Sequence, residues 1–338
     1  MICLVSEQTI PNILPALQLR PDIVYLISTI DQATRGVVIA DFLKSKKINC
    51  EQKTNFDPYD VTAMTNRLRK IVNKRPEDSF ILNVTGGTKL MALAAYSVFS
   101  ESNSEIIYCN TIGNTIKYLY PIVEDIPLES NLDVRSFLAA CGYSVTKPGK
   151  VILSPEKIVF FEAVKKGTIK NIHKLFETIR SMTLNFNPNM IKTGFGDFEF
   201  NKGDKSWTLS SSQYSLNITE RKSFFDGFWL EEYCYWYSKK VLGLNPLSSI
   251  KILSRESTEN EVDLMFVHSA RLYLVSCKSG EFSKKDLIEI ESLKSLAGGT
   301  FGKAFMLSLN PYSDAIIARA KQLRVKLLTP TTFGEILD

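Results

Sequence analysis

Histidine is scarce in this sequence. Only two of the 338 residues are histidines, His173 and His268. The scarcity excludes every metal centre built from several histidines, and it leaves little room for hydrolases that depend on a catalytic histidine.

Cysteines that could act together are also missing. The six cysteines are spread along the chain without a Cys-x-x-Cys pair, so neither a zinc site nor a disulfide framework is indicated. We interpret them as reduced core residues: Cys3, Cys50, Cys109, Cys141, Cys234 and Cys277.

The sequence has no long hydrophobic segment. Its longest clean apolar run, Leu90–Phe99, is half of the roughly 20 residues that span a bilayer. The N-terminal apolar stretch lacks the basic flank of a signal peptide. We therefore expect a cytoplasmic protein that does not contact a membrane.

No large excess of one charge is present either: 41 basic and 36 acidic residues give a formal net charge of +5. This balance permits nucleic-acid binding without indicating it. The length favours two domains joined by a connecting region. We expect domains over residues 1–120 and 222–338, and a connecting region with helices over 121–221.

The first 120 residues alternate apolar strands with helical patterns, which predicts a parallel α/β sheet covered on both faces. The expected strands are Ile2–Val5, Ile23–Ile27, Asn49–Phe56, Phe80–Val84 and Glu105–Thr111. The expected helices are Gln32–Lys46, Tyr59–Asn73 and Lys89–Ser100. Gly113-Asn114 is a turn signal that folds Ile116–Tyr120 back as an antiparallel edge strand.

A glycine-rich loop, Thr85-Gly86-Gly87-Thr88-Lys89, follows the fourth of these strands. Ligands of such sheets bind where the strands end. Two glycines let the backbone approach an anion, the helix start offers free N–H groups, and Lys89 adds a positive charge. The loop lacks the Walker A pattern, so triphosphate hydrolysis is not indicated. A glycine turn that only starts a helix would look the same.

The run Asn83–Ala92 resembles the signature of CARF domains, the Rossmann-like sensors of cyclic oligoadenylates in type III CRISPR antiviral defence. The resemblance covers about residues 1–120. It implies a homodimer that binds a ring-shaped activator, cyclic tetra-adenylate, across its two-fold axis. By this resemblance the pocket is lined by loop residues at the ends of the strands: Ser6, Glu7, Gln8, Ser28, Thr29, Thr85, Gly86, Gly87, Thr88, Lys89 and Asn110.

The connecting region is less informative. It predicts a short helix over Asp133–Cys141, a helical stretch over Pro155–Ser181, and a hairpin or linker over Gly194–Lys205. The basic residues over Lys165–Lys174 could touch a phosphate backbone, although solvent-facing lysines are the commoner explanation.

The last third predicts an αβββαβαβ order. An aromatic helix over Phe224–Lys240 precedes strands at Ile250–Ser254, Glu261–Val267 and Leu272–Lys278. A helix over Lys284–Ala297, a break at Gly298-Gly299, a strand over Lys303–Leu309, a further helix and a strand over Val325–Leu328 complete it.

Three polar residues fall on one face of the hairpin in this order. A tight turn over His268–Arg271 places Asp263 opposite Ser276, and the two-residue period of a strand turns Lys278 the same way. Carboxylates hold Mg²⁺ or Mn²⁺, and a lysine orients the attacking water or neutralises developing charge. Asp263 would be the central metal ligand and Lys278 the catalytic lysine. A structural ion pair is the alternative.

The order resembles the PD-(D/E)xK core of restriction endonucleases and junction resolvases over about residues 222–330. By this resemblance Glu231 is a further metal or water contact. Where the family places an acid two residues before the lysine, this chain has Ser276-Cys277-Lys278. Either the domain is inactive, or Glu289 or Glu291 on the following helix reaches the metal. We favour Glu291, because restriction enzymes with such a serine use a longer spacing.

Together these patterns predict a metal-dependent endonuclease that is activated by cyclic tetra-adenylate and cleaves DNA, RNA or both. A HEPN-type RNase is excluded, because no arginine lies four to six intervening residues before His173 or His268. A ligand-controlled transcription regulator with an inactive nuclease domain remains the alternative.

Overall fold

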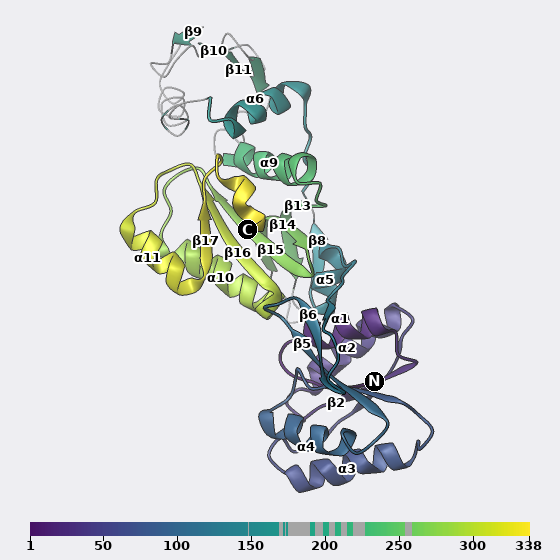
Figure 1. Cartoon of the computed structure of the whole chain (residues 1–338). Helices are drawn as coiled ribbons and strands as arrows, with labels where there is room; N and C mark the ends of the chain where they lie inside the picture. Colours follow the sequence, from purple (N-terminus) through teal and green to yellow (C-terminus); the bar gives the residue numbers. More distant parts are fainter. Residues whose placement is uncertain are drawn as a thin grey trace. The chain divides into compact units, whose positions relative to one another are not determined.

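The computed structural model describes most of the chain, which Figure 1 shows as a cartoon. The described residues are 1–147, 149–168, 172, 174, 190–192, 199–202, 207–210, 215–218, 227–253 and 259–338. His173, most of the second half of the helix expected over Pro155–Ser181 and most of Gly194–Lys205 lie outside them. Among the described residues, no helix has both the length and the apolar character needed to cross a membrane.

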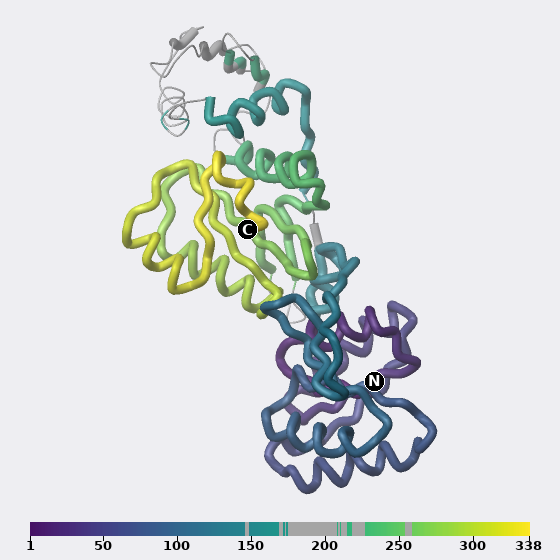
Figure 2. The backbone as a smooth tube through the Cα atoms, in the orientation of Figure 1, coloured from purple at the N-terminus to yellow at the C-terminus, as the bar shows by residue number. Residues whose placement is uncertain are grey.

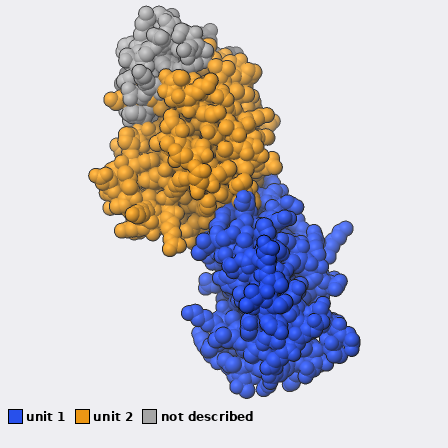
Figure 3. Space-filling view, viewed as in Figure 1, with its two compact units in different colours: residues 1–144, 269–271, 297–301 blue, residues 145–268, 272–296, 302–338 orange. Residues whose placement is uncertain are grey.

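Two compact units make up the chain, coloured separately in Figure 3. Unit 1 comprises residues 1–144, 269–271 and 297–301. Unit 2 comprises residues 145–268, 272–296 and 302–338.

Unit 1 is built on a seven-stranded sheet with the order β3-β2-β1-β4-β5-β6-β7. Strands β1 to β5 run parallel, whereas β6 and β7 are antiparallel additions at one edge. The strands are β1 (Ile2–Leu4), β2 (Ile23–Ile27), β3 (Asn49–Lys53), β4 (Phe80–Asn83), β5 (Ser104–Asn110), β6 (Thr115–Tyr120) and β7 (Ile126–Pro127). The predicted parallel sheet and its returning edge strand are confirmed.

Helices cover both faces of this sheet, as the tube in Figure 2 shows. They are α1 (Ile10–Leu19), α2 (Ala33–Ser45), α3 (Val61–Asn73), α4 (Lys89–Phe99) and α5 (Val134–Ala140). The core below α3 and α4 contains Leu4, Leu68, Leu82 and Ala95, all fully buried. The three helices predicted before residue 120 are confirmed.

The sequence did not predict α1, because Pro15 lies inside it. A proline lacks the N–H that would bond the carbonyl four residues earlier, which usually ends a helix. Here that carbonyl belongs to Pro11, and Asn83 Nδ2 donates to it at 2.9 Å. Burial of Ile13 and Leu14 stabilises the helix further.

Unit 2 contains a six-stranded sheet with the order β17-β16-β15-β14-β13-β8. The strands are β8 (Ser144–Lys147), β13 (Leu247–Leu253), β14 (Glu259–His268), β15 (Arg271–Lys278), β16 (Gly302–Ser308) and β17 (Val325–Leu328). The helices are α6 (Pro155–Lys165), α9 (Trp229–Trp236), α10 (Lys284–Gly298) and α11 (Asp314–Leu323). The predicted αβββαβαβ order is confirmed, and β8 is an addition to it.

Helices α6 and α9 pack through aromatic rings. Phe160 meets Trp229 edge to face with centroids 5.7 Å apart, and Phe161 meets Tyr233 at the same distance. The buried Glu232 accepts two hydrogen bonds from Lys157 Nζ, at 2.6 and 2.8 Å. Residues between these helices include a separate antiparallel sheet of β9 (Met190–Lys192), β10 (Glu199–Lys202), β11 (Trp207–Ser210) and β12 (Ser215–Ile218).

Candidate nuclease site and sensor loop

The β14–β15 hairpin has the tight turn that the sequence predicts. Ser269 and Ala270 occupy its centre with φ angles of 48° and 61°. Left-handed residues at both central positions give the twist that joins antiparallel strands through two residues. The turn therefore sets which residues of the two strands lie side by side.

Asp263 is held by the opposite strand. Its Oδ2 accepts hydrogen bonds from the Cys277 backbone N–H at 2.6 Å and from Ser276 Oγ at 3.3 Å. Cys277 contributes its side chain to the other face, where its Sγ lies 3.6 Å from Cys234 Sγ. Ser276 and Lys278 therefore share a face with Asp263. Burial raises the pKa of Asp263, although the Cys277 N–H and the Lys278 charge oppose this.

Glu231 reaches the same region from α9. Its Oε2 accepts a hydrogen bond of 2.8 Å from Ser249 Oγ. The β13–β14 register pairs Ser248 with Leu264 and Ile250 with Val262, which places Ser249 opposite Asp263. Burial and the Asp263 charge raise the pKa of Glu231 to about 8. Ser249 has a φ of 45°, a left-handed conformation that is costly for a residue other than glycine.

Lys278 is paired with an acid that the sequence did not single out. Its Nζ lies 2.8 Å from Asp286 Oδ1, in the first turn of α10. Burial lowers the pKa of Lys278, but the hydrogen bond with Asp286 and the charges of nearby acids, Asp286 and Asp263 foremost, together outweigh it, so the pKa lies above its ordinary value. The signal that could have found Asp286 is Ser283, three residues earlier, which forms a helix cap with it.

The two glutamates expected to replace the missing acid have partners within α10. Glu289 is exposed and lies 3.5 Å from Lys285. Glu291 accepts a hydrogen bond of 2.6 Å from Ser295 Oγ and lies 3.2 Å from Lys294. The structure brings Asp263, Ser276, Lys278 and Glu231 together, and the roles of Glu289 and Glu291 stay predictions.

The donor set fits a hard divalent cation. No group of three or more His, Cys, Asp or Glu side chains with metal-site spacing occurs among the residues that the structure describes. The Asp263 charge nevertheless raises the cost of ionising Glu231, and a cation bound beside the two carboxylates would relieve it. Mg²⁺ prefers oxygen ligands and keeps several waters, so two carboxylates are sufficient protein ligands for it.

The glycine loop lies at the switch point of the unit 1 sheet. Strands β1 and β4 are central neighbours, and the order runs outward from them in opposite directions. A Cβ at Gly86 would lie 2.1 Å from the Leu4 carbonyl oxygen, and Gly87 has a φ of 74°. Both glycines are therefore required by the backbone, and the loop occupies the position where doubly wound folds bind ligands.

The predicted pocket residues fall into two groups. Several bond to the protein itself: Thr85 Oγ1 donates to Asn83, Thr88 caps α4, Ser28 accepts from Gln52, Thr29 accepts from the Gln32 N–H, and Asn110 accepts from the Gly113 N–H. Lys89 and Glu7 are exposed, and Ser6 and Gln8 are half-buried. Gln8 is bonded as well, since its Oε1 accepts a hydrogen bond from Thr300 Oγ1 at 2.7 Å. The bonded residues shape the loops, and Lys89 and Glu7 are the exposed side chains among the predicted pocket residues.

The two sites define a class of protein that joins a CARF domain to a restriction-enzyme-like nuclease domain. Residues 1–137 match the family model of the Card1 CARF domain, and residues 218–338 match that of the Card1-like endonuclease domain. The chain therefore carries a CARF domain and an endonuclease domain of the Card1 families.

Three solved structures share the fold. Can2 from Sulfobacillus thermosulfidooxidans, in complex with cyclic tetra-adenylate, is 23% identical with a TM-score of 0.76, over 99% of this chain and 96% of that one. Protein VC1899 from Vibrio cholerae is 16% identical with a TM-score of 0.75, over 99% and 95% of the chains. A type III CRISPR defence DNA nuclease activated by cyclic oligoadenylate is 16% identical with a TM-score of 0.60, over 93% and 49%. None of the curated proteins matches the chain.

Proposed function

We propose that this protein is a metal-dependent endonuclease of type III CRISPR antiviral defence, switched on by cyclic tetra-adenylate. One observation carries the proposal: a CARF domain with its glycine loop at the switch point occurs in one chain with the Asp263, Ser276 and Lys278 face of a Card1-like endonuclease domain. The structure of Can2, which shares the fold, is a complex with cyclic tetra-adenylate.

The activator would bind at the glycine loop of unit 1. The start of α4 offers backbone N–H groups next to Gly86 and Gly87, and Lys89 is exposed beside them. Phosphates of a cyclic oligoadenylate would take these donors. The remaining contacts would come from the half-buried and exposed residues Ser6, Glu7 and Gln8, on loops that Ser28, Thr29, Thr85, Thr88 and Asn110 shape.

Asp263 and Glu231 would hold Mg²⁺ or Mn²⁺ at the nuclease site. The bound cation would polarise the scissile phosphate and make water a better nucleophile. Lys278 places a positive charge on the Asp263 face, where it orients the water and neutralises charge that develops on the phosphate. The Cys277 N–H and Ser276 Oγ fix the Asp263 carboxylate. The substrate is DNA, RNA or both, because phosphate contacts alone carry no identity.

The domain limits that we propose are a sensor over residues 1–120, a connecting region over 121–221 and a nuclease domain over 222–338. The protein acts as a homodimer, since a ring-shaped ligand with repeated units selects a two-fold interface.

The test is cleavage of plasmid DNA and of RNA by the purified protein with Mg²⁺ or Mn²⁺, each with and without cyclic tetra-adenylate. We expect cleavage only with both the cation and the activator, and none after chelation. D263A and K278A abolish it, whereas S276A is tolerated because a hydroxyl is a weak ligand beside carboxylates. K89A weakens activator binding roughly 10- to 100-fold, the loss of a charge-assisted contact.

Two results would reject this function. Full cleavage by D263A would show that the Asp263 face is not the nuclease site. Binding of the activator without cleavage of either nucleic acid would favour the transcription regulator instead.

A further inference from the structure

The ion pair between Lys278 and Asp286 lies where the strand that carries the site ends and the next helix begins. Lys278 is the last residue of β15, and Asp286 lies in the first turn of α10. We infer that Asp286 is the positioning residue for Lys278, and that it fixes where the lysine ammonium stands on the Asp263 face. The inference rests on the proposed nuclease function.

Asp286 is itself fixed by the start of α10. Its Oδ2 accepts hydrogen bonds from the Ser283 N–H at 2.7 Å and from Ser283 Oγ at 3.1 Å. Its Oδ1 is the atom that meets Lys278 Nζ. One carboxylate oxygen therefore anchors the side chain to the helix cap, and the other is left to hold the lysine.

The pair is more enclosed than the Lys285–Glu289 pair of the same helix. The side chains of Lys278 and Asp286 are 31% and 22% exposed, whereas those of Lys285 and Glu289 are 84% and 57% exposed. Solvent screens the Lys285–Glu289 pair, so this pair contributes little stabilisation, whereas the Lys278–Asp286 pair is screened far less. An enclosed pair can hold one lysine conformation.

A lysine needs such a partner to act at a defined place. Its ammonium sits on a flexible four-carbon stem and is a point charge without fixed direction. The acidic groups that act on it are Asp286, Asp263 and Glu289, of which Asp286 makes the hydrogen bond. Asp286 therefore decides where the charge of Lys278 stands on the Asp263 face.

The competing explanation is that Asp286 only caps α10. Ser283 separates the two roles, because S283A removes a hydrogen bond from the Oδ2 side and leaves the Oδ1 contact with Lys278 intact. K285Q serves as the second control, since it removes a charge from the exposed face of the same helix, where the Lys285 side chain is 84% exposed.

The first measurement is single-turnover cleavage by the full chain with cation and activator. We expect D286N to be about 10- to 100-fold slower, the cost of losing a charge-assisted hydrogen bond, and D286E to recover part of the rate. S283A and K285Q stay within about twofold of the parent, because neither loses the contact between Asp286 and Lys278. Thermal midpoints verify that each variant is folded.

The second measurement does not need activity. Lys278 of the protein without substrate is labelled with an amine-reactive reagent, and its rate of modification is followed by mass spectrometry. D286N should label Lys278 several-fold faster, because the carboxylate no longer holds the ammonium, and S283A should label it at the parent rate.

Equal labelling of Lys278 in D286N and the parent would overturn the inference, as would equal loss of cleavage in D286N and S283A. Cleavage that survives in D263A would instead reject the proposed function, whatever Asp286 does. The two failures are therefore distinguishable.

Discussion

Glu231 is a carboxyl group whose charge depends on the cation. With its pKa near 8, it is mostly protonated at neutral pH in the metal-free protein. A cation that uses Glu231 must displace that proton, so binding is linked to proton release. The linkage gives the site a pH dependence that an ordinary glutamate would not have.

We predict that the affinity for Mg²⁺ or Mn²⁺ increases from pH 6 to about 8 and changes little above it, because the folded pKa of Glu231 is raised to about 8. Titration calorimetry in buffers of different ionisation enthalpy measures both affinity and released protons. E231Q should bind the cation more weakly and lose this pH dependence, whereas E335Q, at an exposed glutamate outside the site, should keep it. A parent protein that releases no proton would contradict the prediction.

The raised pKa of Glu231 affects stability in the opposite direction: the metal-free fold becomes less stable as the pH rises, whereas cation binding becomes stronger. A raised pKa means that the metal-free fold is favoured while Glu231 is protonated and loses this contribution as pH rises from about 4.5 to about 8. E231Q should therefore flatten the pH dependence of unfolding in this window.

The single residues of the site show most clearly how much could be predicted from the sequence. The shared face of Asp263, Ser276 and Lys278 was predictable, because it depends only on the hairpin turn and on the two-residue period of a strand, which are local features of the sequence. Ser249 and Asp286 depend on β13–β14 register and on the start of α10, where one residue of shift would bring a different side chain to the site. Contacts of this kind depend on how the elements pack together, which the pattern of residues along the sequence does not specify.

Helices α6 and α9 show how an element of the connecting region stabilises the nuclease core. Glu232 is 4% exposed and Lys157 23%, so their ion pair is largely dehydrated. Removing Lys157 takes the nearby counter-charge away from the buried Glu232 carboxylate.

We predict that K157M destabilises the protein by about 3 kcal/mol, because the buried Glu232 carboxylate loses its counter-charge. The matched control is K165M on the same helix. Lys165 lies 3.9 Å from Glu162 with both side chains at least a third exposed, and its loss should cost below about 1 kcal/mol. Denaturant unfolding of unit 2 compares them. Equal losses of stability in K157M and K165M would contradict the larger contribution predicted for the buried pair.

The elements were predictable where their pattern was strong. The parallel strands and the helices α2, α3 and α4 of unit 1 appeared within a few residues of their bounds. Helix α1 did not, because a partner distant in sequence, Asn83, satisfies the carbonyl that Pro15 leaves free. Strand β8 did not, because four residues carry too little periodicity.

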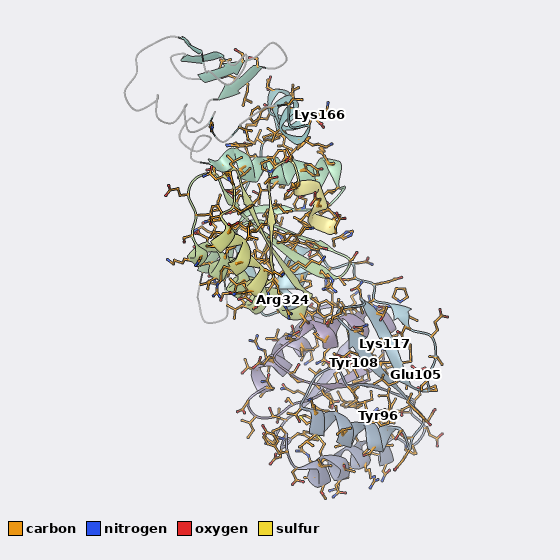
Figure 4. The ribbon with its side chains drawn as sticks, turned by 60° about the vertical axis from the view of Figure 1, so that its left-hand side comes forward. Tyr96, Glu105, Tyr108, Lys117, Lys166 and Arg324 are labelled. Atoms are coloured by element: carbon orange, nitrogen blue, oxygen red, sulfur yellow. The ribbon has the colours of Figure 1, made fainter. Side chains whose placement is uncertain are left out.

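At the scale of the whole molecule, α4 presents an apolar stripe. Leu90, Leu93 and Tyr96 recur every three residues and are 40%, 66% and 37% exposed. Figure 4 labels Tyr96 in unit 1, and the stripe begins one residue after Lys89 of the glycine loop. An exposed apolar stripe of this kind is typical of a protein interface.

We predict that the parent protein is a dimer in solution and that L93E converts it to a monomer, since a charge in an apolar interface is costly to dehydrate. The control is I317E on α11, where Ile317 is 49% exposed. Multi-angle light scattering measures the mass, and activator titration should show weaker binding for L93E. A parent that stays monomeric with and without activator would contradict the homodimer.

The position of β8 has a consequence for any attempt to divide the chain. β8 pairs along β13 at the edge of the nuclease sheet, and the Gly149 N–H extends this pairing to the Ser248 carbonyl at 2.8 Å. A fragment that starts at residue 218 or 222 would release the nuclease half with β13 as a bare edge, whose unpaired N–H and C=O groups recruit strands from other molecules. Cutting at the apparent border would therefore yield an aggregating half, whereas a cut before Ser144 keeps the edge sealed.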